Sequence, residues 1–296
     1  IGQNIGSHVF VPHVSHGITF KSCVSFNTLE TPFWWDMGDI SHETIYDGCL
    51  VALNKFINGS GKVPARKSTA FVLGMGDDNS CINCVSVAGS LGYVDGNLHT
   101  TGAYEWEADN EGIWKFKNCL SHSDFVGLRG WQNTHRNHLI EDFDSYNNKL
   151  GIFHGAYSNC YTYRGGYHFN SPVEVKASSS NTDGVRFEHI TIDGAGKLNY
   201  PLTIFDSPIP SPDDAHTNRF IHCTIKNYVV APVLGTSTFE DNNEFRTIKF
   251  VDFINCDLGS KLPTYDSKAE NGCWMRIQPL SGEAKKIEKS GTVKST

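Results

Sequence analysis

The stretch Phe116-Lys117-Asn118-Cys119-Leu120-Ser121 decides the fold, because its pattern returns along most of the chain. The pattern is an aromatic or apolar residue, two further residues, Cys or a substitute, one residue, and then often Ser or Thr. The position of Cys119 recurs at Cys23, Cys49, Cys84, Cys119, Phe143, Cys160, Ile190, Cys223 and Phe253, mostly in steps of 24 to 35 residues. A period in the range of roughly 20 to 50 residues is typical of solenoids, in which each repeat packs on its neighbours.

A second series of large apolar residues runs in phase with the first. Its members are Trp35, Leu73, Trp106, Leu128, Phe153, Phe169, Phe205 and Leu234. The residue two positions before each member is usually apolar, and alternation with a period of two is typical of strands with one face in the core. No long stretch has the spacing of an amphipathic helix, so a doubly wound α/β fold is excluded.

The two series together predict an all-β protein, a right-handed single-stranded parallel β-helix of about eight to ten coils. We expect this domain to cover residues 1–280. Residues 281–296 are rich in lysine and nearly free of large apolar residues. They predict either a linker-like tail or a terminal edge strand guarded by its lysines.

Corner positions also recur. Four residues after the Cys position, the chain often has a residue that tolerates left-handed or turn backbone. These residues are Asn27, Ser123, Asn147, Gly194, Asn227 and Asp257. They predict a change of strand direction at the same point of each coil.

The nine cysteines fit the same scheme. A repeat position that accepts Cys, Phe or Ile is a core position, where a free Cys behaves as a small hydrophobe. Cys81 and Cys84 form a CxxC pair, but a structural zinc site would need a second pair at suitable spacing. The favoured interpretation is unreactive core thiols, with one disulfide or a metal site as alternatives. The sequence assigns no metal ligand and no cofactor.

Charge and hydropathy exclude two kinds of partner. The net charge of −7 is spread along the chain, which argues against nucleic acid. No apolar run approaches the roughly 20 residues that a membrane helix needs, so no membrane partner is expected.

Functional side chains are expected on positions that face outward beside the second series. Stacked strands lie about 4.8 Å apart, so such residues on successive coils should form one polar surface with tryptophans beside it. The candidate ligand-binding residues are Trp34, Asp36, Glu105, Glu107, Arg129, Trp131, His154, His168 and Asn170. An indole ring for stacking, with fixed donors and acceptors for hydroxyl groups, is what a sugar requires. The sequence therefore predicts an elongated polysaccharide-binding face.

Catalysis is the main alternative. Glu105 and Glu107 lie two residues apart on one strand face, and carboxylates on neighbouring coils could act as acid and base in glycoside hydrolysis. Arg129 or His154 could instead serve a lyase. A calcium-dependent lyase would show a denser set of oxygen ligands, and the chain contains no nucleophile motif, phosphate loop or cofactor fingerprint. We therefore assign no catalytic residue and favour binding, with a purely structural or adhesive solenoid as a third possibility.

Two resemblances point the same way. The stretches 16–28, 33–36 and 44–49 resemble coils of β-helix proteins related to cell-surface hyaluronidases. Residues from about 15 to 260 resemble the parallel β-helix carbohydrate-binding modules appended to gut-bacterial xylanases. The second resemblance implies a secreted or cell-surface protein, xylan or a related plant cell-wall glycan as ligand, no catalysis by this module, and a larger multidomain enzyme around it.

Overall fold

The protein is built of β-strands. The computed structural model describes residues 1–36, 38–55, 68–89, 102–106, 112–130, 137–155, 161–177, 185–206, 218–234, 250–265, 274–288 and 293–295. No helix occurs within these ranges, and hence none that is long and apolar enough to cross a membrane. The all-β prediction is confirmed for this part of the chain.

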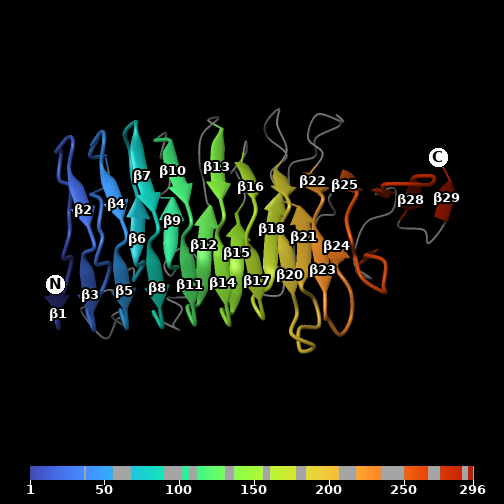
Figure 1. Ribbon diagram of the computed structural model, residues 1–296, viewed down its shortest axis with the longest axis horizontal. Coiled ribbons are helices and arrows are strands. Elements are labelled where there is room, and N and C mark those ends of the chain that lie inside the picture. Colours follow the sequence, from blue (N-terminus) through green and yellow to red (C-terminus); the bar gives the residue numbers. More distant parts are fainter. Residues whose placement is uncertain are drawn as a thin grey trace.

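The strands form three long sheets, which we call A, B and C (Figure 1). Sheet A contains β1 (Gly2–Gln3), β3 (Val24–Phe26), β5 (Leu50–Ala52), β8 (Val85–Val87), β11 (Leu120–His122), β14 (Asp144–Tyr146), β17 (Tyr167–Phe169), β20 (Thr191–Asp193) and β23 (Thr224–Lys226). Sheet B contains β6 (Phe71–Leu73), β9 (Tyr104–Trp106), β12 (Val126–Gly130), β15 (Leu150–His154), β18 (Val173–Ala177), β21 (Leu202–Asp206), β24 (Val233–Leu234) and β26 (Thr264–Tyr265). Sheet C contains β2 (Thr19–Lys21), β4 (Ile45–Asp47), β7 (Asn79–Ile82), β10 (Trp114–Lys117), β13 (His138–Glu141), β16 (Tyr161–Arg164), β19 (Arg186–Glu188), β22 (Asn218–Ile221), β25 (Phe250–Ile254), β27 (Trp274–Gln278), β28 (Lys285–Glu288) and β29 (Val293–Ser295).

The chain visits the sheets in a fixed order. From β10 in sheet C it turns into β11 in sheet A, continues to β12 in sheet B, and returns to sheet C at β13, beside β10. The pairs between successive repeats are parallel up to β27, whereas β28 and β29 add antiparallel strands at the C-terminal end. Figure 1 shows the repeats following one another along the long axis, with the N-terminus at one end and the C-terminus at the other. This arrangement is consistent with a solenoid of stacked coils.

The corner between sheets C and A has the same backbone form in successive repeats. Its first residue has a positive φ, as at Asn83 (56°), Asn118 (54°) and Asn255 (53°). A second corner, after sheet A, has positive φ at Asn27, Ser123, Asn147 and Asn227, as the sequence predicted. Gly194 also lies at this corner, with the left-handed backbone on Ala195, but the prediction is wrong for Asp257, which pairs with Thr224 before the corner.

Most of the described cysteines follow the first corner and point inward. Six of the seven described cysteines lie in one column, which consists of Cys23, Cys49, Cys84, Cys119, Phe143, Gly166, Ile190, Cys223 and Cys256, whereas Cys81 lies in the aromatic column before the corner. The Cys119 thiol donates to the carbonyl of Cys81, and the Cys256 thiol donates to that of Phe220, one repeat earlier. A thiol therefore fits the packed column and also donates a hydrogen bond to a carbonyl of the preceding repeat. The seven cysteines in the described residues are free.

Two predicted members of this column are wrong. Phe253 belongs instead to the neighbouring aromatic column, where it stacks on Phe220 with ring centroids 5.1 Å apart. Cys160 lies outside the described residues, and Gly166 holds the column position in its repeat.

The second series is in the predicted phase at the N-terminal end only. Trp35, Leu73, Trp106 and Leu128 are buried in the core, but Leu128 aligns with Tyr104 and is therefore two residues out of register with Trp106. Phe153 pairs with Arg129 and lies on the outer side of sheet B, because Ile152 is the residue that faces the core.

We predict that the described core thiols are protected from alkylation until the protein unfolds, because the thiolate is the reactive species and these side chains are buried. Peptide mapping after brief alkylation in native buffer should find Cys49, Cys84, Cys119 and Cys223 unmodified. Rapid labelling of three of these four would contradict the assigned column.

We also predict that Cys119→Ala lowers the free energy of unfolding by about 1 to 3 kcal/mol, because it removes a buried sulfur atom from the packed column and leaves a small cavity. Cys23→Ala is the matched control: Cys23 is only half-buried at the end of the column, so the loss should be smaller. Denaturant unfolding of both variants measures the difference.

Candidate functional site

The predicted outward row of sheet B exists but is not exposed. Glu105 and Arg129 lie close together, as the sequence predicted, but Arg129 aligns with Glu105 and not with Glu107, and its Nη1 lies 2.5 Å from Glu105 Oε1. Thr69 Oγ1 also donates to Glu105 Oε2 at 2.6 Å. Both side chains of the ion pair are at most 3% exposed. The expectation of a solvent-accessible polar surface here is therefore wrong, and the pair is a structural element in the interior.

The two histidines also belong to the interior. His154 aligns with Val175, faces the core, and lies 2.9 Å from the Tyr163 hydroxyl through Nδ1. His168 belongs to sheet A rather than sheet B, faces inward, and lies 2.7 Å from Ser145 Oγ through Nδ1. The prediction that they face outward is wrong for both residues.

Asn170 is a corner residue. It has a φ of 47°, and its amide donates to Asn147 Oδ1 of the preceding repeat. Its side chain thus stabilises the stack of corners, and it does not join Glu105 and Arg129.

The remaining candidates divide into two groups. Trp34 and Asp36 do lie together, since Trp34 Nε1 donates to Asp36 Oδ1 at 2.5 Å, and the Trp34 ring stacks on His8. Glu107 and Trp131 lie outside the described residues.

An aromatic surface that the sequence did not identify lies on the outer side of sheet A. We call it the aromatic platform: His122, Tyr146, Tyr167 and Phe169, on β11, β14 and β17. The Tyr146 ring stacks on His122 and contacts Tyr167 and Phe169, with ring centroids 6.1 to 6.4 Å apart. The four rings are half-buried, so one side of the cluster is open to solvent.

Polar groups border the platform at its C-terminal side. The Tyr167 hydroxyl donates to Asp193 Oδ2 at 2.8 Å, and Lys226 Nζ lies 3.7 Å from the same oxygen. Burial and the hydrogen bond to Asp193 raise the pKa of Tyr167 to about 12, so its hydroxyl remains neutral. The platform therefore combines ring faces with a fixed hydroxyl, a carboxylate and an ammonium group.

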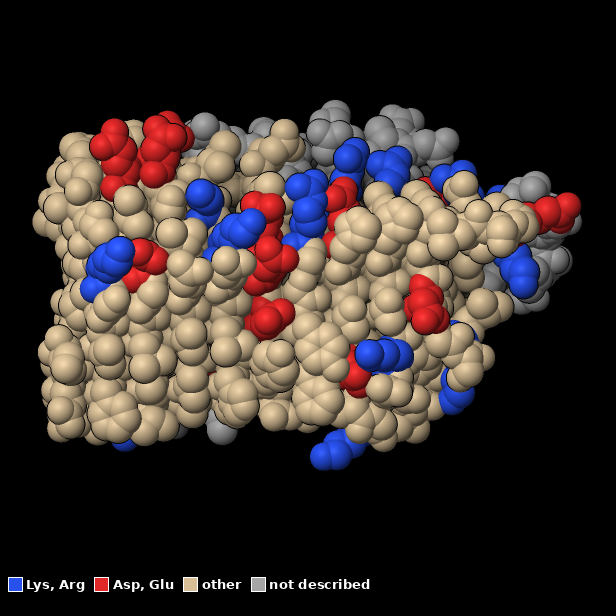
Figure 2. Space-filling view, in the orientation of Figure 1, with Lys and Arg blue, Asp and Glu red and all other residues tan. Residues whose placement is uncertain are grey.

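Asp144 on β14 adds a carboxylate beside the platform, and the outer face of sheet A is nearly uncharged on the strands before β14. Figure 2 shows Lys, Arg, Asp and Glu side chains gathered over the upper part of the molecule, where sheet C lies in Figure 1. The lower left, over β3, β5, β8 and β11, is almost free of them. The outward residues of these four strands are Val24, Phe26, Leu50, Ala52, Val85, Val87, Leu120 and His122.

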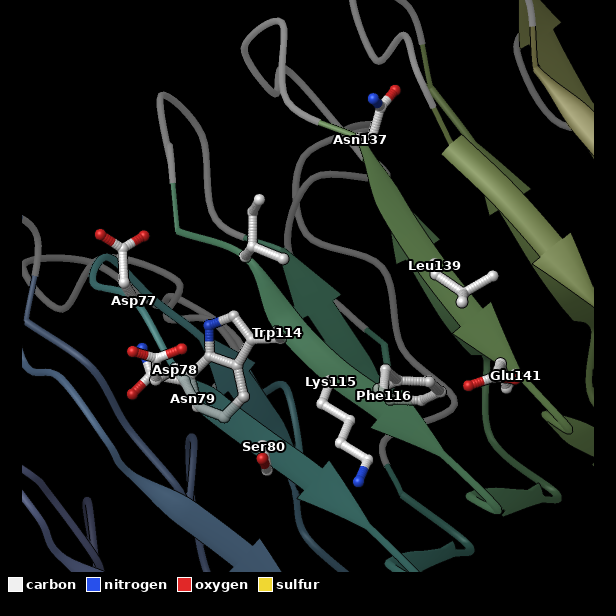
Figure 3. Close-up of a pocket in the computed structure, with 11 residues that line it drawn as sticks. Asp77, Asp78, Asn79, Ser80, Trp114, Lys115, Phe116, Asn137, Leu139 and Glu141 are labelled. Carbon is white, nitrogen blue, oxygen red and sulfur yellow. The ribbon is translucent and has the colours of Figure 1, made fainter.

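A groove of about 600 Å³ crosses the outer side of sheet C over β7, β10 and β13 (Figure 3). Asp77 and Asp78 lie on one side, Asn137 and Glu141 on the other, and Lys115 between them. The groove is open, its lining is more apolar than polar, and it places three carboxylates around one space.

A buried polar row lies behind the second corner. Asp124 accepts hydrogen bonds from the hydroxyls of Ser86 and Ser121 and from the Gly89 amide. Burial nevertheless raises the pKa of the Asp124 carboxyl to about 6. Burial also lowers the pKa of His168, whose side chain faces inward from sheet A, to about 3. Both groups are structural, and both couple folding to pH.

One signal in the sequence could have located the platform. The segment Gly166-Tyr167-His168 matches the recurring Cys-x-Ser pattern, with His168 in the inward serine position. This alignment places Tyr167 and Phe169 outward. The repeat alignment that uses Cys160 as the Cys position is shifted by six residues from the alignment through Gly166, and it assigns Phe169 to the core.

Comparison with known proteins identifies no relative. No protein-family model, curated protein or solved structure gives a significant match to the chain.

We predict that Asp124 and His168 act on stability with opposite signs. Folded Asp124 holds its proton up to about pH 6, against 3.8 for the free group, so its contribution is lost as the pH rises through that window. Folded His168 stays neutral down to about pH 3, against 6.5 for the free group, so its contribution is lost as the pH falls.

The stability of Asp124→Asn relative to the unmodified protein should therefore increase as the pH rises from 4 to 6. The relative stability of His168→Gln should increase as the pH falls from 6 to 4. Each slope is at most about 1.4 kcal/mol per pH unit. Urea unfolding across this range measures both, with His122→Gln on the outer face as control. Slopes of the same sign would refute the assignment.

Proposed function

We propose that this chain is a non-catalytic carbohydrate-binding module that binds a plant polysaccharide, such as xylan, along its outer face. We further propose that sheets A, B and C are the walls of a right-handed, single-stranded parallel β-helix of about eight to ten coils. The observation that carries the proposal is the aromatic platform, with Tyr146 at the centre of four contacting rings.

Ring stacking supports a sugar ligand. The C–H face of a pyranose packs on an aromatic ring, while its hydroxyls need fixed donors and acceptors. At the platform, Asp193 and Lys226 supply such groups beside Tyr167. Lys226 is exposed to water, so a sugar hydroxyl can replace a bound water molecule at its ammonium group with little change in free energy.

The repeat spacing supports a chain-like ligand. Strands stack about 4.8 Å apart, which is close to the rise of one β-1,4-linked pyranose. A polysaccharide that runs along the stacking direction would meet His122, Tyr146 and Phe169 in turn, since these residues align in register. Under this proposal the module is secreted or at the cell surface and belongs to a larger multidomain enzyme.

The groove on sheet C favours a second candidate function, degradation of a polysaccharide. Glycoside hydrolysis requires a pair of carboxyl groups across the scissile bond, and Asp77, Asp78 and Glu141 line one groove. Under this alternative, Glu141→Gln would abolish product release, because an amide cannot transfer the proton.

We predict that Tyr146→Ala and Phe169→Ala each weaken binding to soluble xylan by about 5- to 30-fold, which corresponds to about 1 to 2 kcal/mol of lost stacking. Affinity electrophoresis measures the change. Phe26→Ala is the matched control, since Phe26 lies in the same outer row but at the far end, and its affinity should be unchanged. Circular dichroism confirms that each variant is folded.

Product formation separates the two functions. Retarded migration without new reducing ends or absorbance at unsaturated ends supports a binding module, and release of products that Glu141→Gln abolishes supports an enzyme. If Tyr146→Ala and Phe169→Ala were retarded as strongly as the unmodified protein, the platform would not be the binding surface.

A further inference from the structure

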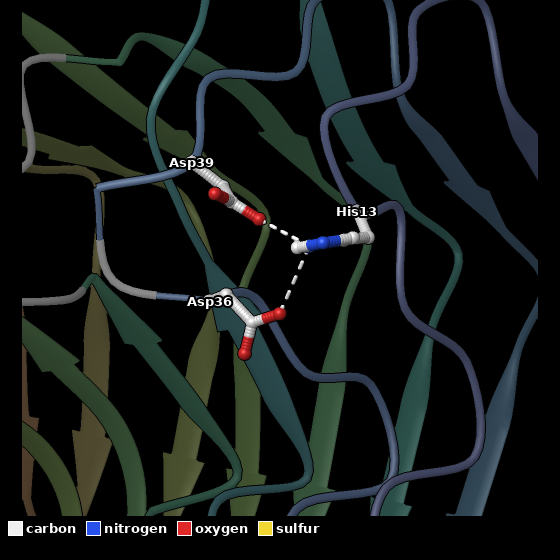
Figure 4. Close-up of side chains that lie close together, drawn as sticks. All are labelled: His13, Asp36 and Asp39. Carbon is white, nitrogen blue, oxygen red and sulfur yellow. Dashed lines mark ion pairs between the residues drawn. The ribbon is translucent and has the colours of Figure 1, made fainter.

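His13, Asp36 and Asp39 converge at a site that is separate from the platform and the groove (Figure 4). His13 Nδ1 lies 3.0 Å from Asp36 Oδ2 and 2.5 Å from Asp39 Oδ2. Asp36 and Asp39 belong to one tight turn, whereas His13 comes from the preceding repeat. The pairing of Phe10 with Phe33 fixes this register, because it sets residue 13 beside residue 36.

The contacts are those of converging ligands rather than of a simple ion pair. A protonated Nδ1 can direct its single N–H at one acceptor, yet two carboxylate oxygens approach it. Asp39 Oδ2 is shielded from solvent and has no hydrogen-bond partner in the described part of the chain, so its close approach to His13 is not an aligned hydrogen bond. This shielded carboxylate oxygen therefore lacks an aligned hydrogen-bond donor, and a cation bound between it and His13 would satisfy it.

Neighbouring groups hold the ligand atoms in place. Trp34 Nε1 donates to Asp36 Oδ1, which leaves Oδ2 directed at the cluster. Trp35 Nε1 donates to the backbone carbonyl of Asp39 at 2.8 Å, which anchors the turn to the core. Outer hydrogen bonds of this kind orient metal ligands in known metalloproteins.

We propose that His13, Asp36 and Asp39 bind a divalent first-row transition-metal ion such as Mn²⁺ or Zn²⁺. Two carboxylates and a neutral imidazole carry a net charge of −2, which a divalent ion balances. The imidazole nitrogen favours these ions over Ca²⁺, which takes oxygen ligands. Zinc binds such ligands at about 2.0 to 2.2 Å, and the three ligand atoms lie within 4.8 Å of one another. The His13 side chain is 68% exposed, so water completes the coordination.

Titration of the chelator-treated full chain with Mn²⁺ tests the proposal. Electron paramagnetic resonance of the free ion gives the affinity, and Zn²⁺ should displace the bound Mn²⁺. We expect His13→Ala and Asp36→Asn to weaken binding by at least about 10- to 100-fold, the loss that follows removal of even an outer partner. Both side chains are largely exposed, so both variants should fold. His189→Ala and Asp142→Asn are the matched controls and should bind as the unmodified protein does.

A local signal distinguishes this site from ion binding elsewhere. Bound Mn²⁺ should broaden the indole N–H resonance of Trp34, assigned by Trp34→Phe, at substoichiometric metal, and His13→Ala should abolish the broadening. The proposal would be overturned if His13→Ala and Asp36→Asn both bound Mn²⁺ as tightly as the unmodified protein. It would also be overturned if Mn²⁺ broadened other resonances but not that of the Trp34 indole.

Discussion

The left-handed corner between sheets C and A is the constraint on which the rest of the structure depends. A residue with positive φ turns the chain, and the next side chain enters the core. Hydrogen bonds between repeats continue through the corner, as from the Asn118 amide to the Glu141 carbonyl. Because the corner recurs with the same form, equivalent residues stack on one another. The Tyr163, Phe187 and Phe220 rings follow in order, with centroids 4.7 and 4.8 Å apart.

This regularity decides where function can lie. The inward columns consist of packed side chains, and some of the buried polar groups bond to one another, as the Ser121 hydroxyl does to Asp124. The outer row of sheet B is buried as well, and its Glu105–Arg129 pair is stabilising only while both partners are present. Sheet A therefore offers an aromatic and nearly uncharged face, sheet C offers a charged groove, and the turn at Asp36 and Asp39 offers the cluster with His13.

The repeat and its inward columns could be predicted from the sequence, because core positions accept only a few residue types. Cys119, Leu73 and Trp106 occupy the predicted core columns for this reason. The candidate site could not be predicted equally well, since phase must be carried through loops of variable length. A shift of six residues at Cys160 moved Phe169 from the surface to the core. Burial of Glu105 and Arg129 has no signature in strand alternation, because alternation gives the side of a sheet and not what covers it. The cluster of His13 with Asp36 depends on register between repeats, which no local motif encodes.

We propose that a polysaccharide binds the outer face of sheet A at the aromatic platform. Hydrogen–deuterium exchange with and without a soluble xylo-oligosaccharide tests this directly, because bound sugar slows exchange of the amides beneath it. We expect slower exchange in peptides that contain β14 and β17, with little change in β7 and β13. Protection confined to the groove strands β7 and β13, or protection nowhere on sheet A, would contradict this proposal.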